Sequence, residues 1–121
     1  SGISTHLAWH PDRSARWSHD IETALYRGIQ EAVTNAVRHS DCSLIRVFVD
    51  ADADALAVRV QDDGTGFDAS EVLRSQDRPF GLLSLQERMA AVGGSVSFDS
   101  QPGRGTTVAL TLPVPRGGGA T

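Results

Sequence analysis

The most regular pattern of apolar and polar positions in the chain lies between residues 19 and 39. Apolar or small side chains recur there every three or four residues, which is the period of an amphipathic α-helix. They fall at Ile21, Ala24, Leu25, Gly28, Ile29, Ala32, Val33, Ala36 and Val37. Along one flank of this helix runs a polar stripe formed by Arg27, Glu31, Asn35 and Arg38. We therefore predict a helix over 19–39 with a buried face and a polar edge.

Alternating apolar and polar residues predict strands in the rest of the chain. These strands run over 3–9, 43–49, 56–61, 95–99 and 106–112, with turns at 50–54 and 101–105 and a loop over 68–80. A second periodic segment from Gly81 to Val92 predicts another helix, which Gly93 and Gly94 end. Grouped helices and hairpin-linked strands, without regular βαβ alternation, indicate an α+β fold with two layers.

Length and composition fit one domain. The chain has 121 residues, of which 40% are hydrophobic and 21% are charged, as in ordinary globular proteins. No apolar run approaches the roughly 18–20 residues that cross a bilayer. The single cysteine, Cys42, excludes an internal disulfide and a zinc site of several cysteines. We expect one domain over 1–121, with residues 1–2 a remnant of cloning and residues 114–121 a flexible tail.

The charged residues limit the classes of partner. Acidic residues outnumber basic ones by 15 to 11, which gives a formal net charge of −4. We therefore expect no broad basic face that would bind nucleic acid. All 11 basic residues are arginines, so the chain has no phosphate-binding lysine of the Walker type and no catalytic lysine. A bound polyanion must be held by arginine, backbone N–H groups, a helix N-terminus or a metal ion.

Two motifs place acidic or amide side chains where they can act on a ligand. Glu31 and Asn35 share one helix face, where an amide oxygen can ligate Mg²⁺ and a carboxylate can take a nucleophile's proton. The run Asp62-Asp63-Gly64-Thr65-Gly66 follows a strand, and its glycines permit close backbone approach. An aspartate at a strand end can accept a hydrogen bond from the amine of adenine, where guanine carries a carbonyl. Taken alone, a solvated helix flank and an ordinary turn are the commoner explanations.

Two further motifs are built around glycine. Gly81 opens the second predicted helix, so the N–H groups that follow it can face a phosphate. The run Gly103-Arg104-Gly105-Thr106-Thr107 joins the last two strands. Taken alone, an ordinary helix start and a β-turn are again the commoner explanations.

The order of the four motifs carries more information than any one of them. Helical Glu-x-x-x-Asn, strand-end Asp-x-Gly-x-Gly, a glycine before a helix and Gly-x-Gly-Thr before a strand follow one another within about 80 residues. Over residues 3–113 this order resembles the N, G1, G2 and G3 boxes of the GHKL ATP-binding superfamily of gyrase, Hsp90, histidine kinases and MutL. Residues 21–39 are similar to the N box of bacterial sensor histidine kinases. Gly81-Leu82, Glu87-Arg88-Met89 and Gly93-Gly94 resemble the NarL/DesK-like subfamily with a short lid.

The resemblance implies a fold and roles for individual residues. The fold would be a Bergerat-type two-layer α/β sandwich, with a mixed sheet packed on helices and ATP between the layers. Asn35 would be the Mg²⁺ ligand, and Glu31 would help to activate the nucleophile. Asp62 would receive the adenine amine, and Thr106 would lie near the adenine. The other implied nucleotide-binding positions are Arg38, His39, Gly64, Gly66, Gly81, Leu82 and Gly105, of which Arg38, Gly81 and Leu82 would face the phosphates.

The resemblance also implies a reaction and partners. The γ-phosphoryl group of ATP would pass to a histidine on a separate dimerisation domain of the same parent protein, and a LuxR-type response regulator would be the next partner. We interpret His19-Asp20 as a helix start and not as the phosphate acceptor. A cytoplasmic domain without direct contact to nucleic acid or membrane is expected. Two alternatives remain open, a GHKL anti-sigma serine kinase and a degenerate, non-catalytic GHKL interaction module.

Overall fold

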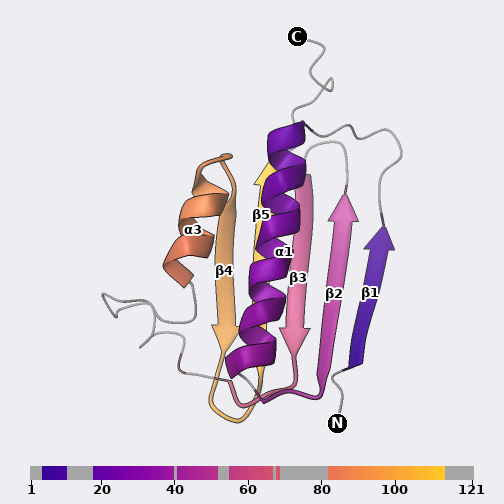
Figure 1. The fold of residues 1–121 in the computed structure, drawn as a ribbon, viewed down its shortest axis with the longest axis vertical. Helices are drawn as coiled ribbons and strands as arrows, with labels where there is room; N and C mark the ends of the chain where they lie inside the picture. Colours follow the sequence, from indigo (N-terminus) through magenta and orange to yellow (C-terminus); the bar gives the residue numbers. More distant parts are fainter. Residues whose placement is uncertain are drawn as a thin grey trace.

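The structure, a computed structural model, describes residues 4–10, 18–39, 41–51, 55–66, 68 and 82–113, and for Trp9, His10, His39 and Leu82 it describes the backbone alone. These residues form five strands and two helices, labelled as in Figure 1. In chain order they are β1 (Ser4–His10), α1 (His19–His39), β2 (Leu44–Ala51), β3 (Ala55–Asp62), α3 (Leu82–Ala90), β4 (Ser95–Ser100) and β5 (Thr106–Pro113).

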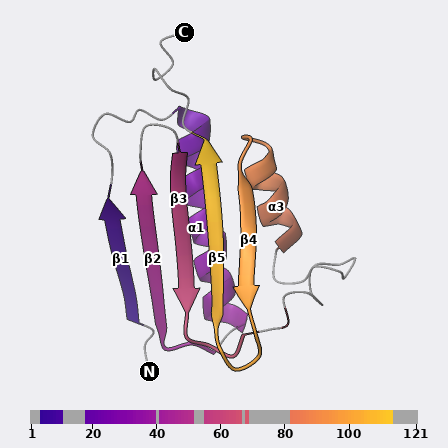
Figure 2. The ribbon, with the colours of Figure 1, turned by 180° about the vertical axis from the view of Figure 1, so that it is seen from behind.

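The five strands form one mixed sheet with the order β1-β2-β3-β5-β4. β1 runs parallel to β2, and every other neighbouring pair is antiparallel. Both helices lie on the same face of the sheet, α1 over β3 and β5 and α3 beside β4 (Figure 1). The view from behind shows the other face bare of any described helix (Figure 2). This arrangement confirms the predicted α+β fold with two layers.

The long helix α1 begins and packs as its sequence predicts. The hydroxyl oxygen of Ser18 accepts a hydrogen bond from the N–H of Ile21 (3.2 Å), which caps the first turn. Gly28 faces β5 and α3, because a Cβ atom there would lie 2.8 Å from Cδ1 of Leu110 and 3.0 Å from Cε of Met89. The missing side chain therefore lets α1 pack closely against both the sheet and α3.

The shorter helix α3 ends at a glycine cap. Gly93 has a φ of 78°, in the left-handed region that glycine adopts most easily. The N–H of Gly94 donates to the carbonyl of Met89 (2.8 Å), which closes the last turn. The cap turns the chain back into β4, so that α3 and β4 form an antiparallel pair on one side of the molecule (Figure 1).

The hydrophobic core lies between the sheet and the two helices. Alternate residues of β2, β3 and β5 are buried, as expected for strands with one covered face. The most completely buried side chains are Ile45, Val49, Leu56, Val58, Leu85, Met89, Leu110 and Leu112. Among the described residues, no helix combines the length and apolar character that a membrane crossing requires.

The predicted elements are confirmed, with their described ends shifted by one or two residues. β2 extends to Ala51, inside the predicted turn at 50–54, and β3 begins at Ala55, directly after that turn. In both strands the alternation of inward-facing and outward-facing positions continues beyond the large apolar residues. Residues 52–54 of that turn, residues 69–80 of the predicted loop and the predicted tail 114–121 lie outside the described residues.

Candidate functional site

The apolar face of the sheet ends in a row of polar side chains. In the register of the strands, Ile45 pairs with Asp62, Asp62 with Thr106, and Thr106 with Ser100. Because these positions continue the alternation of the buried valines and leucines, Asp62, Thr106 and Ser100 belong to the face that the helices cover. Ser100 and Thr106 are the buried polar residues of the described chain. The C-terminal end of α1 lies at this same end of the sheet, and α3 begins beside the lower half of β4 (Figure 1).

The two neighbouring aspartates at the end of β3 have different environments. One carboxylate oxygen of Asp62 accepts a hydrogen bond from the N–H of Gly64 (2.8 Å), which fixes the side chain at the start of the turn. Asp63 points to the start of β2, where its carboxylate accepts from the N–H groups of Ser43 (2.8 Å) and Leu44 (3.0 Å) and from the Ser43 hydroxyl (2.7 Å). The Ser43 hydroxyl, followed by the two N–H groups, lowers the pKa of Asp63 below its ordinary value of 3.8. Asp63 therefore joins two strands, whereas Asp62 belongs to the covered face.

Two glycine-containing turns meet beside Asp62. A Cβ atom on Gly105 would clash with the backbone carbonyl of Asp62, and one on Gly66 would clash with the carbonyl of Gln101. Both glycines have positive φ angles, 76° for Gly105 and 67° for Gly66. The N–H of Gly103 donates to the carbonyl of Thr65 (2.6 Å). The segments 62–66 and 101–105 therefore form one continuous wall at the end of the sheet.

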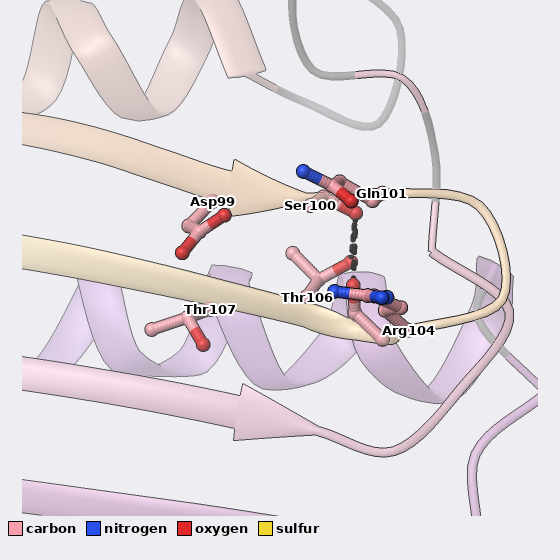
Figure 3. Close-up of a pocket in the computed structure, with 7 residues that line it drawn as sticks. Asp99, Ser100, Gln101, Arg104, Thr106 and Thr107 are labelled. Carbon is pink, nitrogen blue, oxygen red and sulfur yellow. Dashed lines mark hydrogen bonds between the residues drawn. The ribbon is translucent and has the colours of Figure 1, made fainter.

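Ser100 and Thr106 are joined by hydrogen bonds at the base of the turn between β4 and β5. The Ser100 hydroxyl donates to the carbonyl of Gly105 (3.0 Å), and its oxygen lies 2.8 Å from Oγ1 of Thr106 (Figure 3). A cavity of about 280 Å³ lies at this turn. Its lining residues are Asp99, Ser100, Gln101, Arg104, Gly105, Thr106 and Thr107.

The polar edge of α1 approaches the same end of the molecule. Glu31 lies one helical turn before Asn35, and both side chains are half-buried, whereas Arg38 is exposed. A carboxylate oxygen of Glu31 forms an ion pair with Nε of Arg88 on α3 (3.7 Å). Nε of Arg88 is buried and has no hydrogen-bond partner among the described residues. The pair joins the two helices next to the half-buried amide of Asn35.

A profile of the histidine kinase-, DNA gyrase B- and HSP90-like ATPases matches residues 20–116, which include α1, the polar row and both glycine turns. The chain belongs to this family. Within this family it resembles the ATP-binding catalytic domain of two-component sensor histidine kinases. The resemblance that the sequence shows to the GHKL superfamily is thereby confirmed.

Several sensor kinases are similar to this chain. A sensor-like histidine kinase of Chloroflexus aurantiacus is 44% identical over 97 residues, which are 78% of this chain and 16% of that protein. The histidine-protein kinase/phosphatase DegS of Bacillus subtilis is 36% identical, over 82% of this chain and 26% of DegS. The oxygen sensor histidine kinase NreB of Staphylococcus carnosus is 34% identical, over 90% of this chain and 31% of NreB. The chain thus spans less than a third of each relative.

Solved structures of histidine kinases share the fold. The histidine kinase domain of the blue-light activated kinase of Erythrobacter litoralis EL346 has a TM-score of 0.69 at 16% identity, over 94% of this chain and 52% of that one. The ATP binding domain of PrrB from Mycobacterium tuberculosis has a TM-score of 0.64 at 25% identity, over 77% of this chain and 68% of that one. These similarities confirm the two-layer architecture expected for a histidine kinase domain.

The residues that the resemblance implies for this kinase domain fall into three groups. Asp62 and Thr106 lie side by side in the polar row, and Gly64, Gly66 and Gly105 belong to the adjoining turns. Glu31, Asn35 and Arg38 lie along one edge of α1. The backbones of His39 and Leu82 are helical, at the end of α1 and the start of α3, and Gly81 lies outside the described residues.

The sequence-based set lacks three residues with side-chain contacts, two at this end of the sheet and one on α3 that pairs with α1. They are Asp63, Arg88 and Ser100. Ser100 continues the inward alternation of Val96 and Phe98 in β4, so strand periodicity could have placed it on the covered face. The ion pair of Arg88 depends on the way that α3 packs against α1, which no local pattern reveals.

Proposed function

We propose that the polar row and the two glycine turns hold the adenine of ATP, and that the γ-phosphoryl group passes to a histidine on a separate dimerisation domain of the parent protein. The observation that carries this proposal is the placement of the Asp62 carboxylate. It sits at the covered end of β3, held by the N–H of Gly64 and paired in register with Thr106. The family consists of ATPases, so the nucleotide expected here is ATP, and the Asp62 carboxylate can accept a hydrogen bond from its adenine base.

The chemistry of Asp62 favours adenine over guanine. A carboxylate only accepts hydrogen bonds at neutral pH, and it has room for more than one donor. The amine at C6 of adenine is a donor, whereas guanine presents a carbonyl there. A guanine base in the same position would place two acceptors against each other, and the unmatched buried groups would weaken its binding.

The residues present also fit a magnesium ion. Mg²⁺ in nucleotide sites is usually held by one or two protein oxygens together with phosphate oxygens. The half-buried amide of Asn35, with Glu31 one turn away, is such a set. Among the described residues no group of three or more His, Cys, Asp or Glu side chains could hold a metal ion. When bound, the ion would neutralise charge on the phosphates during transfer.

The remaining residues would act on the phosphates and on the nucleophile. Arg38 is exposed near the end of α1, and with no lysine in the chain we assign phosphate contacts to it, with His39 following it. The N–H groups at Gly81 and Leu82, where α3 begins, would also face the phosphates. The Glu31 carboxylate would hold the proton of the attacking imidazole.

The sensor-kinase relatives also suggest the partners. We infer that the parent protein carries the dimerisation domain with the acceptor histidine, and that a LuxR-type response regulator receives the phosphoryl group from it. The resemblance of Gly81-Leu82 and Glu87-Arg88-Met89 to the NarL/DesK-like subfamily, together with the sensor-kinase names of the relatives, supports this inference. We place this domain in the cytoplasm, where ATP is available.

Autophosphorylation of the parent protein with γ-labelled ATP tests the proposed reaction. The wild-type protein is expected to acquire label that is stable to base and lost in acid, as phosphohistidine is. Asn35→Ala should abolish labelling, and the matched control Ser97→Ala, on the bare face of β4, should leave it unchanged. Acid-stable label would contradict the proposal and would favour a serine kinase, and full labelling of Asn35→Ala would remove Asn35 from the site.

A further inference from the structure

The hydrogen bonds of Ser100 determine which way the hydroxyl of Thr106 points its proton. A serine hydroxyl has one proton to donate and two lone pairs that accept. The carbonyl of Gly105 can only accept, so the Ser100 proton lies in the 3.0 Å bond to that oxygen. In the 2.8 Å contact between Ser100 and Thr106 either oxygen could be the donor by distance alone; with the Ser100 proton in the bond to Gly105, Ser100 is the acceptor and Thr106 the donor. Figure 3 shows these bonds at the base of the β4–β5 turn.

The direction of this bond changes what Thr106 can offer a ligand. Its proton is committed to Ser100, so its oxygen presents lone pairs alone to the covered face of the sheet. Both hydroxyls are buried, with 6% of Ser100 and 9% of Thr106 exposed, so water cannot readily replace either partner. Thr106 is paired in register with Asp62, whose carboxylate is also an acceptor. At the end of the sheet, the Thr106 hydroxyl and the Asp62 carboxylate thus lie side by side and accept hydrogen bonds from a ligand without donating any.

We propose that Ser100 is a positioning residue that sets the base specificity of the nucleotide site by keeping Thr106 an acceptor; this inference rests on the proposed adenine site. A purine with an amine at C6 matches two acceptors, either directly or through a water molecule that donates to Thr106. A purine with a carbonyl at C6 does not. If Thr106 could rotate its proton towards the ligand, it would donate to that carbonyl, and the discrimination against guanine would fall to the part that Asp62 supplies. Ser100 prevents this rotation.

Titration calorimetry of the domain with Mg-ATP and with Mg-GTP tests the inference. Ser100→Ala removes the acceptor for the Thr106 proton, so the ratio of ATP affinity to GTP affinity should fall about tenfold. Ser100→Thr keeps a hydroxyl and should restore most of the wild-type ratio. Ser97→Ala, the same change on the bare face of the same strand, should leave the ratio unaltered. A merely structural role for Ser100 would weaken both nucleotides equally.

The outcomes separate this inference from the proposed function. If the wild-type domain binds ATP and Ser100→Ala keeps the wild-type ratio, the role of Ser100 is refuted and the ATP site stands. If the folded wild-type domain binds no ATP, the proposed function itself fails. Should Ser100→Ala not fold, proton NMR of the wild-type domain decides the direction directly. The Thr106 hydroxyl proton should show a nuclear Overhauser effect to the β-protons of Ser100, and a Ser100 hydroxyl proton directed at Thr106 would overturn the inference.

Discussion

The close approach of two backbones at Gly105 gives a quantitative prediction. A Cβ atom on Gly105 would lie nearer to the carbonyl oxygen of Asp62 than the 3.0 Å below which real Cβ atoms essentially never come. The φ of Gly105 is 76°, so an alanine there also pays the strain of the left-handed region, about 1–2 kcal/mol. Forcing β3 away from β5 adds a further penalty of roughly 1–3 kcal/mol. Gly105→Ala should therefore lower the free energy of unfolding by about 2–5 kcal/mol.

Gly103 supplies a matched control in the same turn. Its φ is 81°, close to that of Gly105, but a Cβ atom there meets nothing within 4 Å. Gly103→Ala should therefore show the backbone strain alone, a loss of about 1–2 kcal/mol. The difference between the two variants isolates the contact of Gly105 with Asp62.

Urea denaturation measures both free energies of unfolding, and calorimetry measures the affinity for ATP. Because the clash is with the residue that we assign to adenine, Gly105→Ala should also weaken ATP binding, whereas Gly103→Ala should weaken it little. Equal losses of stability in the two variants would refute the reasoning, since the close approach would then impose no constraint. Unchanged ATP affinity in a destabilised Gly105→Ala variant would separate the packing of the turns from the nucleotide site.

Three further predictions concern other parts of the domain. Asp63→Asn should lower the free energy of unfolding at neutral pH. Hydrogen bonds depress the pKa of Asp63 in the folded state, so the stabilisation by its carboxylate is complete above the ordinary pKa of 3.8. This stabilisation is lost as the pH falls through the lower pKa of the folded state. A destabilisation by Asp63→Asn that stays constant in urea titrations down to the acid range would contradict it. Arg88→Met should lower the free energy of unfolding by less than about 1 kcal/mol, because the ion pair with Glu31 is partly exposed. The same variant should reduce kcat for autophosphorylation of the parent protein with little change in KM for ATP. A raised KM at constant kcat would argue against this prediction. Met89→Ala should cost about 2–5 kcal/mol in urea denaturation, because Met89 is fully buried, and a loss below about 1 kcal/mol would show that the core refills the space.

Much of the fold follows from periodicity in the sequence. The three- and four-residue spacing of α1 and the alternation of the strands are local patterns, and the structure places both kinds of element within two residues of their predicted ends. The parallel pairing of β1 with β2 is different, because it depends on which strand edge is left open after the other strands pair. Alternation alone contains no information on that choice.

The site was predictable only in part. The alternation of Leu56, Val58 and Val60 already places Asp62 on the covered face of β3 and Asp63 on the other side. The register that sets Asp62 beside Thr106 depends on the pairing of β3 with β5, which no local pattern reveals. Serine is common at the ends of strands, so its residue type does not single out Ser100, whose importance depends on the hydroxyl of Thr106 across the β4–β5 pair. The Arg88–Glu31 pair likewise depends on tertiary packing.

The central claim, that Asp62 receives the adenine of ATP, is tested most directly by one calorimetric comparison. The domain is titrated with Mg-ATP as wild type, as Asp62→Asn and as Asp50→Asn, the last being the same chemical change on the bare face of β2. The account predicts that the wild type and Asp50→Asn bind ATP alike and that Asp62→Asn binds about 10- to 100-fold more weakly, as expected for a lost hydrogen bond to a charged group. Equal ATP affinity of the folded Asp62→Asn variant and the wild type would contradict it.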